Sequence, residues 1–233
     1  MKIIHLLAIL FLIGVASARA AVVCPKDNPG YFCLPSDQNQ NKEMNSTNFY
    51  LVPAKIIGLF NQEISAAGYP LHLEANWESP YFGAGVSLYD NAFHLMILGG
   101  TARVAEFTED AYAAVVCHEI GHIIAGEPHQ TISGAEWSSS EGQSDFFAAS
   151  VCLPRYFKSL NEKNISARIE KAGFEMMNSF RKFDSNSKDK SLNRTRPSLP
   201  GTKETLINKY PSIQCRYENF RDPAKRAACW YRD

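Results

Sequence analysis

A predicted helix with two histidines on one face constrains the fold and function of this chain more than any other segment. Residues 108–125 combine an N-cap residue, acidic residues in the first turn and a glycine after the last turn, and this pattern predicts an α-helix. His118 and His122 lie in it at positions i and i+4, so both rings project from the same face. Glu119 stands between them, in the order His-Glu-Ile-Gly-His. This HExxH arrangement suits one metal ion held by two imidazoles, with a carboxylate that reaches a metal-bound water without being a ligand. A chance match is the alternative, but the apolar flank at 113–116 is typical of a buried helix.

A second helix, predicted over residues 140–153, carries two spaced carboxylates. Glu141 and Asp145 are at positions i and i+4 and therefore share a face. A catalytic zinc ion takes three protein ligands and keeps one open position, so two histidines need a third ligand, for which Glu141 is the candidate. Asp145 is expected to accept a hydrogen bond from the second ring nitrogen of a ligating histidine, which is His118 if the helices are antiparallel. An ExxxD pair alone is common on solvated helices, and the preceding HExxH makes it specific.

HExxH followed by ExxxD on a second helix resembles the gluzincin branch of the zincin metallopeptidases. The short spacing is similar to that of thermolysin-like enzymes and of the minigluzincins, and the resemblance covers residues 93–153. It implies one zinc ion per chain and a general base and proton shuttle at Glu119. It also implies that the three zinc ligands are His118, His122 and Glu141, and that Asp145 supports one of these ligands.

The same resemblance implies an α+β fold, in which a twisted, mostly antiparallel sheet packs on the HExxH helix and on the second helix with its glutamate. The family pairs an extended substrate with an edge strand, and residues 93–98 are expected there, a core strand being the alternative. Hydrophobic patterns independently predict the elements of this fold. They are a helix at 54–67, strands at 71–77, 83–89 and 93–98, and a further helix at 166–180.

The rival metzincin pattern, HExxHxxGxxH, does not fit the spacing. It requires a glycine at Ala125 and a histidine at Pro128, whereas Gly126 and His129 are each displaced by one position. His129 is therefore expected in a surface loop, and it is the replacement ligand if Glu141 does not bind the metal.

A weaker similarity lies near the C-terminus. Gluzincins of the prenyl-protein peptidase type carry a His-Pro followed by an arginine, and this chain has Tyr210-Pro211 and Arg216 at that spacing. The resemblance implies that Tyr210 and Arg216 are candidate stabilisers of the transition state, since a hydrogen-bond donor there can stabilise an oxyanion. The tyrosine departs from the family pattern, and a turn proline with a structural arginine is the alternative.

The N-terminus differs in kind from the rest of the chain. A lysine and an apolar run precede Ala18-Arg19-Ala20, which suits cleavage before Ala21, so residues 1–20 predict a secretory signal. No stable membrane anchor is expected, because a span needs about 20 apolar residues. We therefore expect an exported protein, periplasmic or secreted.

The exported part contains six cysteines, an even number that predicts disulfides in an oxidising compartment. Cys24 and Cys33 share a loop with proline and glycine and are expected to pair locally. A zymogen role, in which one of these two thiolates caps a metal, is the alternative. The remaining four could pair in three ways, which the sequence leaves open: Cys117, Cys152, Cys215 and Cys229.

Charge limits the choice of partner. The 24 Lys+Arg balance 24 Asp+Glu, so no nucleic-acid partner is expected, and a peptide or protein substrate is expected instead. The oligomeric state stays open.

After the signal, the chain divides into an N-terminal cysteine loop and linker at 21–50, a zincin-like catalytic domain at 51–181, and a polar linker with a cysteine-containing C-terminal extension at 182–233.

These patterns predict an exported zinc metallopeptidase, in first place an endopeptidase, in which Glu119 activates a zinc-bound water for attack on a peptide carbonyl. Two alternatives are a non-catalytic, zinc-stabilised binding module of the same fold and a hydrolase of another amide, such as a cell-wall peptide. A purely structural zinc site needs no general base, so Glu119 favours catalysis.

Overall fold

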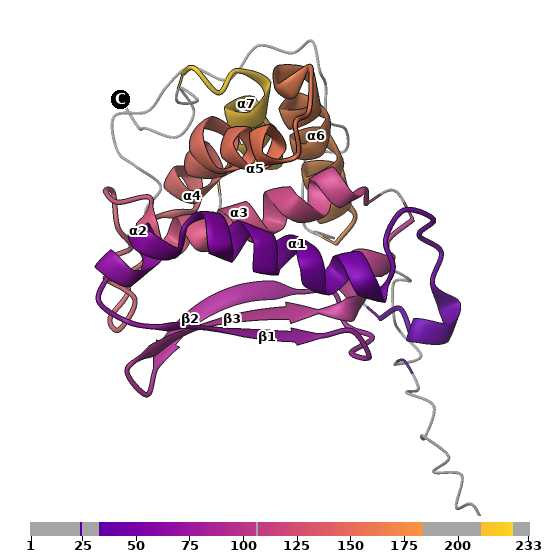
Figure 1. Cartoon of the computed structure of the whole chain (residues 1–233), viewed down its shortest axis with the longest axis horizontal. Helices are drawn as coiled ribbons and strands as arrows, with labels where there is room; N and C mark the ends of the chain where they lie inside the picture. Colours follow the sequence, from indigo (N-terminus) through magenta and orange to yellow (C-terminus); the bar gives the residue numbers. More distant parts are fainter. Residues whose placement is uncertain (1–23, 25–32, 106, 184–210, 226–233) are drawn as a thin grey trace, which may run out of the picture.

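The computed structural model describes residue 24 and residues 33–105, 107–183 and 211–225. In these ranges one sheet carries layers of helices on one of its faces: α1 and α3 lie next to the sheet, and α4 to α7 lie beyond them (Figure 1). The sheet contains β1 (Leu71–Asn76), β2 (Ala84–Tyr89) and β3 (Ala92–Leu98). The helices are α1 (Ser46–Leu59), α2 (Asn61–Ala66), α3 (Glu109–Ile124), α4 (Glu141–Phe147), α5 (Leu153–Ser159), α6 (Ile165–Phe183) and α7 (Ile213–Arg221). The expected α+β class is confirmed.

The sheet has the order β1-β3-β2 and is mixed rather than mostly antiparallel. β2 and β3 form the expected hairpin, whose two-residue turn places Asp90 and Asn91 at φ 50° and 55°. β1 pairs in parallel with β3, on the side away from β2. Residues 93–98 therefore belong to the central strand, and the expectation of an edge strand there is wrong. Hydrogen bonding on both sides suits a strand whose Phe93 is buried together with other apolar side chains.

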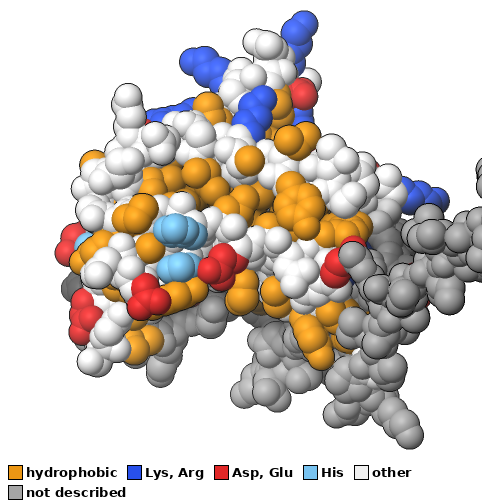
Figure 2. Space-filling model, turned by 60° about the horizontal axis from the view of Figure 1, so that its bottom comes forward, with side chains coloured by type: hydrophobic (Ala, Val, Ile, Leu, Met, Phe, Trp, Pro, Cys, Tyr) orange, Lys and Arg blue, Asp and Glu red, His pale blue; other side chains and the backbone are white. Residues whose placement is uncertain are grey.

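The other face of the sheet carries polar and aromatic side chains. Figure 2, which brings the lower side of Figure 1 forward, shows histidine and acidic side chains among apolar ones, with lysine and arginine toward the margins. His94 stacks between His72 and Tyr89, with ring centroids 5.2 Å and 3.6 Å away. Glu74 lies 2.7 Å from Nδ1 of His94 and accepts a hydrogen bond from the Tyr89 hydroxyl at 3.0 Å. The two strand histidines thus contact each other and lie outside the candidate metal-binding group described below.

The first helix begins earlier than its apolar pattern predicts. Asn45 caps α1, because its side chain accepts from the backbone N–H groups of Thr47 and Asn48, while the Asn48 side chain accepts from the Asn45 N–H. This reciprocal cap lies in a polar stretch whose composition is typical of a linker. Met44, which precedes the cap residue in this stretch, is buried. The polar residues therefore start a helix of the core.

Two complete disulfides join described cysteines. The expected local pair Cys24–Cys33 is confirmed, and Cys117 pairs with Cys152. Cys215 is also disulfide-bonded, and Cys229 lies outside the described residues, as do the predicted signal at 1–20 and Tyr210. Disulfides persist in oxidising compartments, which is consistent with an extracytoplasmic location. None of the helices in the described ranges has the length and apolar composition to cross a bilayer.

Candidate metal centre

The HExxH residues occupy the C-terminal half of α3, a helix that is buried over nearly its whole length. Thr108 caps this helix by accepting from the Ala111 N–H, and the helix then runs unbroken to Ile124. His118 and His122 are 5% and 6% exposed, although both are polar. Buried polar groups need partners, so the surroundings of the two rings decide what the site can do.

Both rings meet the carboxylate of Glu141, the first residue of α4. The two histidine Nε2 atoms are 3.1 Å apart. Nε2 of His118 lies 3.2 Å from Oε2 of Glu141, and Nε2 of His122 lies 3.6 Å from its Oε1. The three ligand atoms that these residues offer all lie within 4.8 Å of one another, so the triad could hold a metal ion, and it is the only such group among the described residues.

The triad also leaves one buried oxygen unused. Oε2 of Glu141 is buried without a hydrogen-bond partner among the described residues, although Nε2 of His118 lies 3.2 Å away. A buried carboxylate oxygen without a donor is costly to keep. A cation between the three side chains would remove that cost, so the residues present fit a bound metal.

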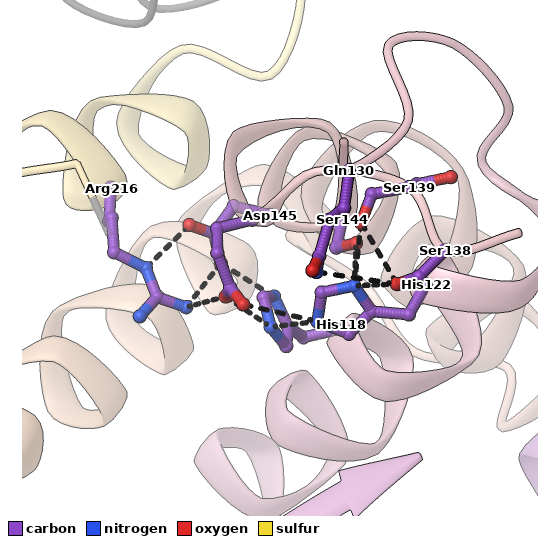
Figure 3. Close-up of polar contacts among 9 residues, drawn as sticks. His118, His122, Gln130, Ser138, Ser139, Ser144, Asp145 and Arg216 are labelled. Atoms are coloured by element: carbon purple, nitrogen blue, oxygen red, sulfur yellow. Dashed lines mark hydrogen bonds and ion pairs between the residues drawn. The ribbon is translucent and has the colours of Figure 1, made fainter. Parts of the chain in front are cut away.

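Asp145 holds the outer nitrogen of His118. Its Oδ1 lies 2.8 Å from Nδ1 of His118, and Figure 3 shows Asp145 between that ring and Arg216 of α7. Arg216 donates from Nε to Oδ2 at 2.7 Å and from Nη2 to Oδ1 at 3.0 Å. Burial raises the pKa of Asp145, but the charges of Arg216 and His118 outweigh it, so the pKa lies below its ordinary value. An ionised Asp145 keeps a proton on Nδ1 and turns Nε2 toward Glu141.

His122 is held by oxygens that the motifs do not predict. Its Nδ1 lies 2.8 Å from the Ser139 carbonyl oxygen, 3.0 Å from Oγ of Ser144 and 3.1 Å from Oγ of Ser138 (Figure 3). A carbonyl oxygen only accepts, so Nδ1 carries the proton and Nε2 is free to bind a metal. The serine-rich stretch before α4 was the available signal, but only the packing of α4 on α3 shows which serines contact the ring.

Protons and a metal ion would compete for this centre. Burial lowers the pKa of His118, but Asp145 and Glu141 outweigh it and raise the pKa to about 10. Burial raises the pKa of Glu141, and His118, His122 and Arg216 outweigh it and lower the pKa to about 2. Without a metal, His118 is therefore protonated at neutral pH beside an ionised glutamate.

Metal affinity is expected to rise with pH for this reason. Below the raised pKa of His118, each metal ion must displace one proton from Nε2, so affinity should rise about tenfold per pH unit between about pH 6 and pH 8. Competition with a chromophoric chelator of known pH dependence measures this slope. An affinity independent of pH would contradict the protonated resting state of His118.

Three further candidate residues, Glu119, Arg216 and His129, lie at different positions relative to the triad. Glu119 is 8% exposed, and no hydrogen bond or ion pair with the described residues occupies its carboxylate. Arg216 reaches the centre through Asp145, and its Nη2 is 3.9 Å from Oε2 of Glu141. His129 lies in the loop between α3 and α4, 3.9 Å from Glu127 and outside the triad. A contact of Arg216 or Tyr210 with a substrate stays a prediction.

Comparison with protein-family models, with curated proteins and with solved structures gives no match. The site therefore has to be interpreted from its own geometry. That geometry is a buried His-His-Glu triad that could hold a metal ion, set in an α+β fold and supported through Asp145 and Arg216.

Proposed function

We propose that this chain is an exported zinc-dependent peptidase of the gluzincin type, which hydrolyses peptide bonds with Glu119 as general base. The observation that carries the proposal is the convergence of His118, His122 and Glu141 from two helices, with Glu119 directly beside the first ligand. The resemblance in the motifs supports the same reaction.

Zinc is the ion that this ligand set favours. Two imidazoles and one carboxylate with an open position are typical of catalytic zinc. Ligand atoms at 2.0–2.2 Å from an ion and at tetrahedral angles lie about 3.3–3.6 Å apart. The two Nε2 atoms are 3.1 Å apart, and the Glu141 carboxylate lies 3.2 Å from His118 through Oε2 and 3.6 Å from His122 through Oε1. A shift of this carboxylate would present one of its oxygens to an ion shared by both rings.

The chemistry divides between the ion and the chain. Bound zinc supplies a Lewis acid, which polarises a carbonyl oxygen and makes water more acidic. Glu119 takes a proton from the attacking water and passes it to the departing amine, so that no charged leaving group forms. Asp145 and Arg216 hold His118 in the orientation and tautomer that bind the ion.

Strand β2 is the proposed docking edge for the substrate backbone. Within the described sheet it pairs only with β3, and it contacts α3. An extended peptide added to β2 would run along the helix that carries His118 and Glu119. The small residues Ala84 and Gly85 would let such a peptide approach closely.

Two other functions remain candidates. A non-catalytic zinc-stabilised module would bind the ion without turnover, and a hydrolase of a cell-wall peptide or another amide would use the same site on a different bond. The unoccupied carboxylate of Glu119 favours a hydrolase, because a structural site has no use for a buried base there.

Chelation is expected to abolish hydrolysis reversibly. The purified protein should contain about one zinc ion per chain by elemental analysis, and it should cleave members of a diverse peptide pool, as read by mass spectrometry. Removal of zinc by a chelator should stop cleavage, and added zinc should restore it. Folded protein that takes up no zinc would refute the proposed function, and zinc without cleavage of any peptide would favour the binding module.

A further inference from the structure

Three contacts lie along one seam between the two helices that carry the metal ligands. The Gln143 side chain donates to the Ala125 carbonyl at 2.6 Å. At Gly121 an added Cβ would lie 2.9 Å from Cα of Ser144, so the two backbones almost touch. The third contact is the Cys117–Cys152 disulfide. The partners run in opposite order along the chain, which shows that the two helical segments are antiparallel.

The disulfide bonds the two ligand-bearing segments to each other close to the triad. Cys117 directly precedes His118 in α3. Cys152 ends a π-helical turn, Ala148–Cys152, which continues α4 beyond Asp145 without a break. Both sulfur-bearing side chains are fully buried. One covalent bond therefore limits how far the histidine helix can slide along the glutamate helix.

The centre depends on that limit because its contacts cross the seam. His118 contacts Glu141 through Nε2 at 3.2 Å and Asp145 through Nδ1 at 2.8 Å, and both acids belong to the opposite segment. Ligands must keep their productive geometry to within about 0.5 Å to bind well. The π-helical turn follows Asp145 and ends at Cys152. The disulfide therefore also fixes the C-terminal end of this turn, where the segment departs from regular α-helix.

We propose that Cys117 and Cys152 are positioning residues of the metal centre, so that metal affinity depends on the oxidation of this pair. The inference rests on the proposed metal site and adds a regulation to it. Oxidation removes two electrons and two protons from the two thiols and joins their sulfurs. A disulfide-containing oxidant of the exported compartment accepts both electrons and both protons and becomes a dithiol. The chain thus gains its full affinity for the metal only after this bond has formed.

The test compares two disulfide deletions. In Cys117→Ala/Cys152→Ala, zinc affinity is expected to fall about 10- to 100-fold, as when a group that supports a ligand is lost. In the matched control Cys24→Ala/Cys33→Ala, which removes a disulfide outside the ligand helices, it should stay within a factor of about 2. A second control, Leu153→Ala, removes buried volume beside Cys152 but keeps the bond, and should lower thermal stability while retaining zinc affinity.

Each outcome decides the proposal. Affinity is measured by competition with a chelator at a temperature where circular dichroism shows every variant folded. Zinc binding by Cys117→Ala/Cys152→Ala equal to that of wild type would overturn the positioning role. If this variant folds only when zinc is supplied, the ion replaces the missing bond and the role is supported; if it folds under neither condition, the disulfide serves the core and the role is refuted. A folded, oxidised wild type without zinc affinity would instead refute the metal site itself.

Discussion

Glu119→Gln is expected to abolish hydrolysis while zinc binding and fold stay unchanged. Glutamine has nearly the same shape as glutamate but cannot accept the proton of the attacking water. General-base assistance contributes about 100- to 10,000-fold, and the same residue also delivers the proton to the amine, so kcat should fall by at least that factor. The carboxylate has no ion pair with the described residues, so its loss should not disturb the triad.

The measurement is kcat for one cleaved peptide, with zinc content and circular dichroism of the same preparations. Glu127→Gln is the matched control, because its side chain is 84% exposed in the loop between α3 and α4. Turnover in Glu119→Gln comparable to that of wild type would refute the general-base role.

The second large effect separates the metal ligand from the residues that support it. Glu141→Ala should weaken zinc binding by more than about 100-fold, beyond the cost of a lost supporting group, because two imidazoles alone leave a weak site. Asp145→Asn should keep the zinc site, because His118 itself remains, but the affinity for zinc should fall about 10- to 100-fold, because His118 loses the carboxylate that supports it. Zinc titrations of both variants decide the assignment.

Stability gives the two variants a second signature. Asp145 is fully buried against Arg216, whose side chain is 4% exposed, so Asp145→Asn removes the close ion pair of this buried arginine, whose Nη2 then has the Glu141 carboxylate at 3.9 Å. Breaking such a pair costs about 3–5 kcal/mol in the free energy of unfolding, whereas Glu141→Ala keeps the Arg216–Asp145 pair and should cost less. Chemical denaturation of the metal-free variants measures this difference. If Asp145→Asn abolishes zinc binding while Glu141→Ala barely changes it, the two roles are reversed; if only His129→Ala matters, the gluzincin interpretation is wrong.

Local sequence patterns were sufficient to predict several helices and strands of this protein and the candidate metal ligands. The cap at Thr108, the shared face of His118 and His122, and the turn at Asp90-Asn91 each depend on residues within a few positions of one another. Helix and hairpin geometry relate such neighbours directly, so patterns in the sequence predicted α3 and the β2–β3 hairpin. The same rule placed the carboxylates of Glu141 and Asp145 on one face.

The tertiary structure decided the features that join distant segments. A hairpin pattern names the partner of β3 on one side only, so the parallel pairing with β1 and the central place of β3 had to come from packing. The Cys117–Cys152 bond, the serine oxygens at His122 and the Arg216–Asp145 pair likewise follow from how α3, α4 and α7 meet. These contacts depend on relative helix positions in space, which the spacing of residues along one element does not encode.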